Sequence, residues 1–464
     1  MDIKFGTDGW RGVIADDFTF ANIERVAAAM AAYVKLEGKP ERGLIVGYDT
    51  RFLSAEAADL VAQVVAGAGI YVTLADRATP TPAVSYAVVA RKAAAGIMVT
   101  ASHNPYKWNG IKFKAAYGGS AAPSIVLGIE QQLDKSAPVR TRRGIAVDDL
   151  IAPYLDRLGE LVHLDRIASS GRRLVIDPMY GAGRGVLARL FQAAGVPFGE
   201  IHGEHNPLFP GLNPEPIEPH VEELRQVVVK SGYDAGLATD GDADRVGAID
   251  RAGGFIDSHK IFCILLQHLV RDRGLTGEVV KTFSTTRMVD KIAAKYGLRV
   301  HVTPIGFKYI CELMLTRDIL IGGEESGGIG TKGYLPERDG LLNSLLLAEV
   351  MADRGKTLGE LVEELSAEFG PHEYGRVDLE VKRDAMGRLL ARVKDDAFKK
   401  VAGLRITNTE SLDGFKMSFG DEAWLLVRPS GTENMLRLYA EAPTREQVKA
   451  LLEEMTALAY DCEA

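Results

Sequence analysis

Three aspartates at alternating positions, Asp240, Asp242 and Asp244, close an apolar stretch in the segment TDGDADRVG. Carboxylates this close together repel one another unless a hard cation lies among them, and their oxygens are the ligands that Mg²⁺ prefers. An EF-hand calcium loop is excluded, because Arg245 occupies its glycine position and Arg251 its closing glutamate position. A metal-free, Asp-rich turn is the simpler alternative. The spacing favours a magnesium site, in which Arg245 can neutralise excess charge or reach an anionic ligand.

A serine in the segment VTASHNPYKWNGIK follows another apolar run, at residues 96–99. Alone, it predicts only a loop after a strand, with Ser102 as a candidate helix cap and Asn104 and Pro105 as turn formers. The chain has no G-x-S-x-G sequence, which removes the main support for an α/β-hydrolase nucleophile. His103 beside Ser102 does not indicate a catalytic triad, since triad residues come together through folding.

The segment RPSGTEN, at residues 428–434, carries residue types that suit a phosphate group. Arg428 can clamp phosphate oxygens bidentately. Hydroxyl and backbone N–H donors are offered by Ser430, Gly431 and Thr432. A simple Ser-Gly turn explains the same residues equally well.

The segments GEESGG (323–328) and FGTDGWRG (5–12) are two further polar, glycine-rich loops. Glu324 and Ser326 offer carboxylate and hydroxyl groups that suit the paired hydroxyls of a sugar, although a solvated loop is the simpler alternative. Arg11 adds a cation to what is otherwise explained as a tight turn. The segment YGAGRG (180–185) lacks the sixth-position glycine of the dinucleotide-binding fingerprint, and no P-loop sequence occurs in the chain.

These loops lie within a succession of apolar and helix-period stretches that occurs three times. The copies open at GLIVGYDTR (43–51), RLVIDPMYGAG (173–183) and GEVVKTFSTTR (277–287). Each has a short apolar run, a turn, a helical segment and a second apolar run, which is typical of βαβ units around a mainly parallel sheet. Ligands bind beyond the carboxyl ends of such strands, so we expect the Ser102, aspartate and Glu324 loops at equivalent points.

After about residue 370 the chain alternates between apolar and polar residues, and it ends in a helical segment from Thr444. This pattern predicts antiparallel strands in a smaller α+β domain. The fold class expected is α/β, with three tandem mixed or mainly parallel α/β domains before that domain. The expected domains are domain I with the serine loop (1–150), domain II with the metal loop (151–258), domain III with the sugar loop (259–370) and domain IV with the phosphate loop (371–464).

The chain has 464 residues, 46% hydrophobic and 25% charged, which is enough for three or four domains with adequate cores. Its formal net charge of −8 argues against nucleic acid or an anionic membrane as a partner, so local cations must hold any anionic ligand. Three scattered cysteines favour a reducing compartment. No apolar run reaches ~18 residues and the N-terminus lacks signal-peptide character, which predicts a cytoplasmic protein.

The segments TASHNP, DGDADR, GEESGG and RPSGTEN, in this order, resemble the α-D-phosphohexomutase superfamily of phosphoglucomutase and phosphomannomutase type. The resemblance covers essentially the whole chain. Members interconvert hexose 1-phosphates and hexose 6-phosphates. The resemblance implies four domains around a central active-site cleft, each contributing one loop. It also implies sugar phosphates as ligands, Mg²⁺ as cofactor, glucose 1,6-bisphosphate as activator, and a monomer or homodimer.

The resemblance gives a role to each matching position. Ser102 would be phosphorylated in the resting enzyme and donate its phosphoryl group, and a phosphoserine oxygen would join the three aspartates around Mg²⁺. Glu324 and Ser326 match the sugar-recognition loop. The loop for the phosphate that is not transferred is matched by Arg428, Ser430, Gly431 and Thr432. Positions around the transferring phosphate are matched by Arg11, His103, Lys112, Arg245 and Lys281.

A phosphoryl group in transfer carries charge on three oxygens, so a metal ion and a ring of Arg and Lys side chains are suited to stabilise it. In the expected cycle, phospho-Ser102 gives its group to the free hydroxyl of the bound sugar phosphate. The resulting hexose 1,6-bisphosphate turns over and returns its other phosphate to Ser102. Proton transfer needs a base, for which Lys112 and His103 are candidates. We favour Lys112 for the substrate hydroxyl.

Two departures from the family pattern bear on the sugar. Gly328 stands where phosphomannomutase-type members often have a histidine, and Phe307 stands where some members carry another. Because GEESG is closer to the glucomutase style, we expect glucose as the favoured sugar, with mannose also accepted. The alternatives are a phosphomannomutase or phosphoglucosamine mutase with the same mechanism, a phosphatase, and a non-catalytic sugar-phosphate-binding relative. The intact serine and aspartates argue against the last.

Overall fold

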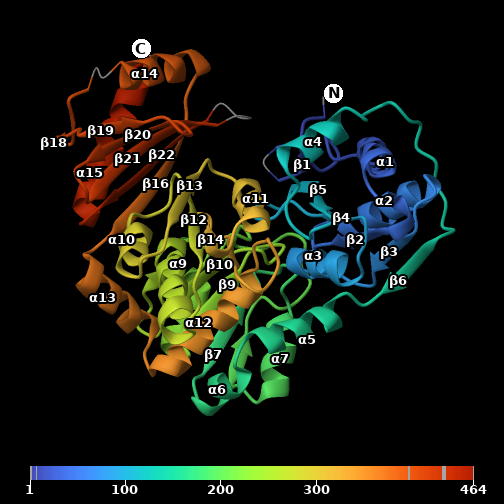
Figure 1. Cartoon of the computed structure of the whole chain (residues 1–464), viewed down its shortest axis with the longest axis horizontal. Helices are drawn as coiled ribbons and strands as arrows, with labels where there is room; N and C mark the ends of the chain where they lie inside the picture. The colour runs from blue at the N-terminus through green and yellow to red at the C-terminus, as the bar shows by residue number, and fades with distance from the viewer. Residues whose placement is uncertain (1–2, 7, 396–397, 431–434, 463–464) are drawn as a thin grey trace. The chain divides into compact units, whose positions relative to one another are not determined.

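The computed structural model describes residues 3–6, 8–395, 398–430 and 435–462 (Figure 1). The chain divides into two compact units. The first comprises Met1–Glu278 and Gly306–Leu361, and the second comprises Val279–Ile305 and Val362–Ala464. None of the helices in these described ranges is both long and apolar enough to cross a membrane.

The N-terminal part of the first unit folds around a six-stranded mixed sheet. Its strands, in spatial order, are β1 (Trp10–Val13), β5 (Trp108–Ala115), β4 (Ala95–Val99), β2 (Leu44–Tyr48), β3 (Val72–Ala75) and β6 (Ile145–Asp148). β2 is parallel to β3 and β4, and β3 is parallel to β6, as expected for βαβ units. β5 runs antiparallel to its neighbours β1 and β4.

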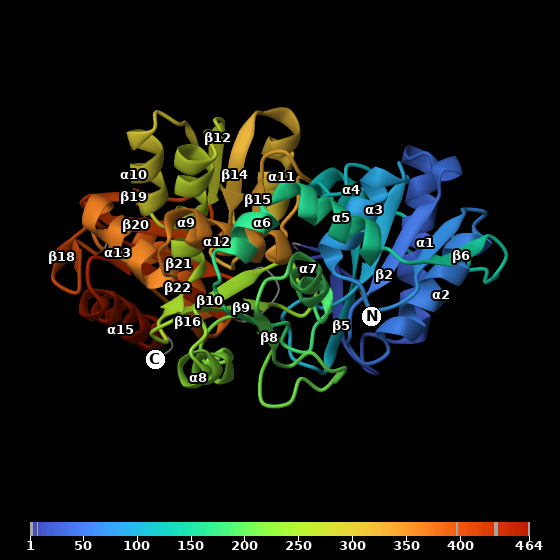
Figure 2. The ribbon, with the colours of Figure 1, turned by 90° about the horizontal axis from the view of Figure 1, so that it is seen from below.

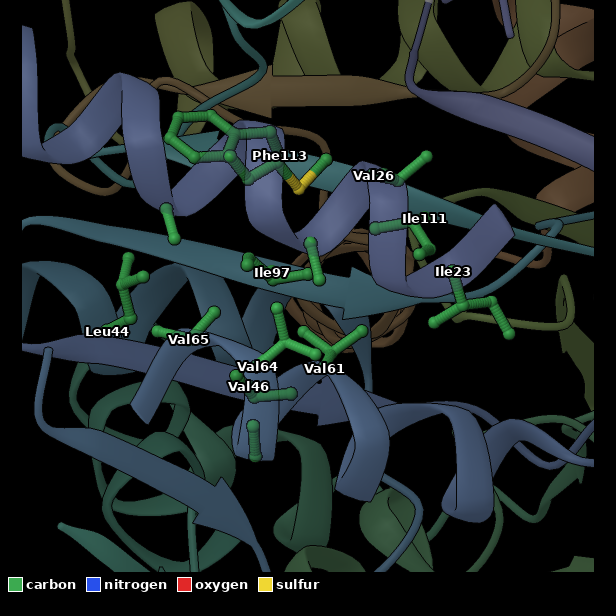
Figure 3. Close-up of a cluster of buried hydrophobic side chains, with 14 of the residues drawn as sticks. Ile23, Val26, Leu44, Val46, Val61, Val64, Val65, Ile97, Ile111 and Phe113 are labelled. Carbon is green, nitrogen blue, oxygen red and sulfur yellow. The ribbon is translucent and has the colours of Figure 1, made fainter. Parts of the chain in front are cut away.

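Helices cover both faces of this sheet (Figures 1 and 2). They are α1 (Phe20–Glu37), α2 (Ser54–Gly67), α3 (Thr81–Ala90) and α4 (Pro123–Glu130), with a 3₁₀ turn at Pro40–Arg42. Figure 3 shows Ile23 of α1 and Val61 of α2 in one core with Leu44 and Val46 of β2. Ile45 belongs to the core beneath α3 on the other face, because successive strand residues point to opposite sides.

A second mixed sheet forms the middle of the first unit. Its strands, in spatial order, are β11 (Phe255–Ile256), β10 (Val246–Asp250), β9 (Ala235–Thr239), β7 (Leu174–Asp177) and β8 (Phe198–Glu200). β7 is parallel to β8 and β9, whereas β10 is antiparallel to β9 and β11. The helices of this region are α5 (Ile151–Leu161), α6 (Leu164–Ser169), α7 (Val186–Ala194), α8 (Glu222–Ser231) and α9 (Ser258–Gln267), which continues as a π-helical turn at His268–Asp272.

The third repeat contributes elements to both units. In the first unit, β14 (Ile319–Gly323) pairs antiparallel with β15 (Ile329–Thr331), and the helices are α11 (Phe307–Thr316) and α12 (Gly340–Arg354). In the second unit, β12 (Glu278–Thr282) pairs in parallel with β13 (Val300–Thr303), and α10 (Met288–Lys295) separates them in the chain. The carboxylate of Asp339 caps α12 by accepting a hydrogen bond of 2.9 Å from the Leu342 N–H.

The C-terminal part of the second unit is an antiparallel sheet. Its strands, in spatial order, are β16 (Glu373–Glu380), β22 (Met435–Ala442), β21 (Ala423–Pro429), β20 (Phe415–Phe419) and β19 (Asn408–Glu410). Other elements are α13 (Leu358–Phe369), which runs across the division between the units, α14 (Arg383–Lys394), β17 (Lys400–Val401), β18 (Leu404–Arg405) and α15 (Arg445–Asp461). α14 and α15 pack against the apolar face of this sheet, and Figure 2 shows α15 beside it. The prediction of α/β parts followed by a smaller α+β part is confirmed.

Candidate active site

Ser102 lies in the connection between β4 and β5. The residue is fully buried and adopts a left-handed backbone conformation with φ of 53°. Its Oγ donates a hydrogen bond of 2.8 Å to Oδ2 of Asp240. Its backbone N–H donates to Thr100 Oγ1 at 2.8 Å. A non-glycine residue in this conformation costs roughly 1–3 kcal/mol, so the surrounding contacts must hold the loop.

Arg51 supplies most of the contacts that hold the serine loop. Its guanidinium donates hydrogen bonds to the carbonyl oxygens of Ser102 (2.6 Å), Asn104 (2.6 Å), Pro105 (3.1 Å) and Trp108 (3.1 Å). The buried carboxylate of Asp49 pairs with the Arg51 Nε at 3.2 Å. Both residues directly follow β2 in the segment GYDTR, at the same sheet edge as the serine loop. Sequence reasoning did not single them out, although a charged pair at that edge could have indicated them.

The three aspartates lie in the connection between β9 and β10 and are all fully buried. One oxygen from each lies within 4.8 Å of the others. Burial and the neighbouring Asp242 and Asp244 raise the pKa of Asp240 well above its ordinary value. Oδ1 of Asp242 and Oδ1 of Asp244 accept no hydrogen bond from any residue in the described part of the chain. Buried carboxylate oxygens without partners are suited to a cation.

The serine and aspartate loops approach each other closely at Gly241. A Cβ atom on Gly241 would lie 2.4 Å from the carbonyl oxygen of Ser102, so only glycine fits here. Thr81, at the start of α3, fixes the same loop: its Oγ1 donates to Asp242 Oδ2 at 2.5 Å. The backbone N–H of Thr81 donates to the Asp242 carbonyl at 2.9 Å.

Lys112 of β5 lies among carboxylates. Its Nζ lies 2.8 Å from Asp242 Oδ2, 3.2 Å from Asp244 Oδ2 and 2.9 Å from Asp8 Oδ2. Burial lowers the pKa of Lys112, but the three carboxylates outweigh burial and raise it above its ordinary value. Asp8, which sequence reasoning missed, is held in its charged form: burial opposes this, but Lys112 and Lys114 bring its pKa well below the usual range.

Three further predicted residues border the same group. Arg11 of β1 donates to Oδ1 of Asn104 at 2.5 Å, and burial lowers the pKa of Arg11. The Arg245 Nε lies 3.9 Å from Asp240 Oδ2 and 3.9 Å from Asp244 Oδ1. The ring Nδ1 of His103 lies 3.5 Å from the Ser102 Oγ. The first unit therefore brings a serine, three aspartates and several cations together.

Glu324 and Ser326 lie in the connection between β14 and β15. Glu324 is buried and Ser326 is partly exposed. Burial raises the pKa of the Glu324 carboxyl to about 7, although Arg338 opposes the rise. Arg338, which sequence reasoning also missed, donates to Glu324 Oε2 at 3.2 Å and to Asp244 Oδ2 at 2.7 Å. The sugar-type loop is thus joined to the aspartate loop through one guanidinium.

The remaining predicted residues belong to the second unit. The Nζ of Lys281, on β12, donates to the Thr286 carbonyl at 2.9 Å. The Nε of Arg428, on β21, donates to Asp413 Oδ1 at 2.9 Å. The backbone N–H of Ser430 donates to the Met435 carbonyl. The other two predicted members of this loop, Gly431 and Thr432, lie outside the described residues.

Four sequence families match consecutive parts of the chain. They are described as phosphoglucomutase/phosphomannomutase α/β/α domains I, II and III and the C-terminal domain, and they match residues 2–140, 152–253, 257–369 and 390–458.

Whole-chain relatives agree with these families. A phosphoglucomutase/phosphomannomutase from Thermococcus kodakarensis is 31% identical over 98% of this chain and 97% of its own length. A phosphoglucosamine mutase from Limosilactobacillus reuteri is 32% identical over 98% of both chains. A crystal structure from Thermus thermophilus, assigned as a phosphomannomutase, superposes with a TM-score of 0.89 at 38% identity and covers 99% of both chains.

Three mixed α/β sheets and a C-terminal domain, with a buried serine facing aspartates and basic side chains, define a class of multidomain phosphotransferases. The chain belongs to the phosphoglucomutase/phosphomannomutase family of the α-D-phosphohexomutase superfamily. It is an isomerase-class phosphotransferase of the phosphohexomutase type.

Proposed function

We propose that this enzyme interconverts glucose 1-phosphate and glucose 6-phosphate, accepts the mannose phosphates as well, and carries the phosphoryl group on Ser102. The observation that supports this most directly is the 2.8 Å hydrogen bond from Ser102 Oγ to Asp240. It places a hydroxyl that can carry a phosphate beside three buried carboxylates. Two of these carboxylates keep an oxygen without a hydrogen-bond partner among the described residues, which suits a metal ion.

Asp240, Asp242 and Asp244 are the residues that would hold Mg²⁺, together with an oxygen on Ser102. The metal would supply electrostatic stabilisation of the charge on the transferring group. Lys112 pairs with Asp242, and Arg338 pairs with Asp244.

The proposed reaction breaks the bond between phosphorus and Ser102 Oγ and forms one between phosphorus and the free sugar hydroxyl. The proton leaves that hydroxyl and finally restores the hydroxyl of Ser102. His103 is the proposed acceptor of the proton, because burial is outweighed by the carboxylates around Lys112, which raise its pKa and keep it protonated, so that Lys112 is suited to donate a proton. Arg11 and Arg245 would stabilise the transferring group. The hexose 1,6-bisphosphate then turns over, and its other phosphate returns to Ser102.

This cycle explains why glucose 1,6-bisphosphate should act as an activator. If the bisphosphate leaves before the second transfer, Ser102 is left without its phosphate and the enzyme cannot start another cycle. Added bisphosphate would phosphorylate Ser102 again. An enzyme that loses its intermediate in this way shows a requirement that rises with enzyme dilution.

The proposal keeps the roles predicted for two groups of residues. Glu324 and Ser326 would bind hydroxyls, because a buried carboxylate is a strong acceptor for paired O–H donors. The phosphate that is not transferred would be bound by Arg428, Ser430, Gly431 and Thr432, whereas Lys281 is proposed to bind the transferring phosphate. The four-domain division at about residues 150, 258 and 370 is part of the same proposal.

A phosphoglucosamine mutase is the second candidate, because the Limosilactobacillus relative of that name is as similar to this chain as the phosphoglucomutase/phosphomannomutase from Thermococcus. The glucose proposal is supported by Gly328 and Phe307. Rates with glucose 1-phosphate, mannose 1-phosphate and glucosamine 1-phosphate, each with Mg²⁺ and the matching 1,6-bisphosphate, decide between them. A clear preference for glucosamine would overturn the glucose assignment and leave the mechanism standing.

The mechanism is tested by Ser102→Ala. We expect isomerisation to fall by more than about a thousandfold, because no other side chain replaces the phosphate carrier. The purified wild-type chain should carry one phosphate by intact mass, and the variant none. Ser169→Ala, on the exposed surface of α6, is the matched control. Near-normal turnover of Ser102→Ala would show that the phosphoserine mechanism is wrong.

A further inference from the structure

Arg338 joins three separate segments of the first unit at one guanidinium. Its Nη2 lies 2.7 Å from Asp244 Oδ2 and 2.7 Å from Asp8 Oδ2, and its Nη1 lies 3.2 Å from Glu324 Oε2. The residue is 5% exposed. The aspartate loop, the sugar-type loop and the N-terminal segment therefore share a single buried cation.

The backbone that carries Arg338 is anchored on both sides. Glu337 is fully buried and pairs with the fully buried Lys114. Asp339 caps α12 and accepts hydrogen bonds of 2.9 Å from the Tyr154 hydroxyl. The Arg338 guanidinium also lies over the ring of Phe307, 5.5 Å from its centroid. The arm of Arg338 therefore has little freedom to move.

Gly328 provides the space that this arm occupies. A Cβ atom on residue 328 would lie 2.1 Å from Cδ and 2.9 Å from Cγ of Arg338, and 3.3 Å from Oε2 of Glu324. These are atoms in the middle of a side chain whose end is held by three carboxylates, so they cannot move aside cheaply. Any side chain at residue 328 must therefore displace Arg338 from Glu324.

We propose that Arg338, in the space left by Gly328, is a positioning residue that fixes the Glu324 carboxylate for sugar binding and couples it to the metal site. Arg338 directs one donor to the sugar-type loop and another to Asp244, so a change in one loop alters the charge available to the other. Its Nε is buried and lies 3.9 Å from Glu337 Oε1, so a fourth carboxylate helps to hold the guanidinium in place. This inference rests on the proposed function of Glu324 and the aspartates.

The inference is tested by comparing Gly328→Ala, Arg338→Ala and the double variant. We expect each single substitution to raise KM for glucose 1-phosphate by about tenfold to a hundredfold, as for loss of a charge-assisted hydrogen bond to a buried partner. The KM of the double variant should be no higher than that of Arg338→Ala, because the methyl group added at residue 328 then meets no arginine side chain. If the increases in KM of the two single variants instead multiply in the double variant, residue 328 and the Arg338 side chain do not compete for the same space. Gly254→Ala, whose added Cβ meets no atom within 4 Å, is the control.

The coupling to the metal site has its own readout. In the chain that keeps Arg338, Glu324→Gln should shift the Mg²⁺ concentration that gives half-maximal activity by about threefold or more. The reason is that the guanidinium then loses one carboxylate partner and interacts more strongly with Asp244. In the Arg338→Lys background, this shift should shrink, since lysine cannot bridge both loops. An equal shift in both backgrounds would overturn the coupling.

These results separate the inference from the proposed function. If the wild-type enzyme isomerises none of the hexose phosphates, the proposed function fails. If it does so but Gly328→Ala and Arg338→Lys leave KM and the Mg²⁺ requirement unchanged, only the role of Arg338 fails. Calorimetric binding of glucose 6-phosphate and the melting temperature are measured for every variant. A variant that melts like the wild type but binds the sugar phosphate more weakly supports positioning over a purely structural role.

Discussion

The hydroxyl of Ser102 and the carboxylate of Asp240 are joined by a 2.8 Å hydrogen bond across 138 positions of the chain. The bond connects the ends of two different sheets, since Ser102 follows β4 and Asp240 follows β9. A phosphate added to Ser102 Oγ would enter a group of carboxylates, where it requires a cation. Under the proposed mechanism, phosphorylation of Ser102 and metal binding therefore depend on each other.

Asp240→Asn should remove this dependence. Burial and two neighbouring carboxylates raise the pKa of Asp240, so the amide relieves repulsion while the metal is absent. We expect the metal-free variant to melt at or above the wild-type temperature, and Mg²⁺ to stabilise the wild type but not the variant. Thermal unfolding in Mg²⁺ and in EDTA measures both effects. Asp148→Asn, on an exposed pair with Arg91, is the control and should respond to Mg²⁺ like the wild type.

Arg51→Lys should disrupt the serine loop. A lysine cannot donate to the carbonyl groups of Ser102, Asn104, Pro105 and Trp108 together, so several buried acceptors would lose their partners. We expect a loss of roughly 2–4 kcal/mol in the free energy of unfolding and at least a tenfold fall in turnover. Urea denaturation and steady-state kinetics check these values. Arg77→Lys, at an exposed arginine, should leave both unchanged.

Glu337→Gln should destabilise the first unit without directly altering the proposed metal ligands. Glu337 and Lys114 are both fully buried, and the substitution removes the nearest carboxylate from the lysine charge and leaves it Asp8, 4.0 Å away. We expect a loss of about 3–5 kcal/mol in the free energy of unfolding. Adding Lys114→Met should recover much of this loss, because the lysine charge is then removed. If the double variant is less stable than Glu337→Gln alone, the buried lysine charge is not the cause.

Lys416 should make the stability of the second unit depend on pH. Burial and the nearby Lys281 lower the pKa of Lys416 from 10.5 to about 7. Between these values the unfolded chain binds more protons than the folded chain, so the free energy of unfolding rises with pH above about 7. Lys416→Met should remove up to about 2 kcal/mol of this rise between about pH 7.5 and 9. Trp424, whose ring centroid lies 3.9 Å from the Lys416 Nζ, gives a fluorescence signal for urea denaturation. Lys449→Met, at an exposed lysine, should keep the wild-type slope.

The parts of the site that the sequence predicted are those with a local pattern. The alternating aspartates and the serine each follow an apolar run, so the sequence places them at the ends of strands. The topology of parallel sheets brings such strand ends together. The same reasoning predicted the α/β repeats and the antiparallel C-terminal strands.

Arg51, Asp8 and Arg338 escaped prediction for a physical reason. Each acts through contacts with segments far away in the chain. Asp8 lies in FGTDGWRG (5–12) and Arg51 in GLIVGYDTR (43–51), but these patterns predicted a turn and a strand and assigned neither residue a contact. Arg338 pairs with Asp8 across 330 positions. The only local signals were the Asp-x-Arg that follows β2 and an arginine directly before Asp339, a residue typical of helix caps.

The pairing of Asp8 with Arg338 also has a consequence for biosynthesis. Arg338 is added to the growing chain 330 positions after Asp8, and long after Ser102 and the aspartates. Until then, the guanidinium that pairs with Asp8, Asp244 and Glu324 is missing from the chain. Contacts of such long sequence separation form late in folding. The loops around Ser102 can therefore acquire their final geometry only after most of the first unit has left the ribosome.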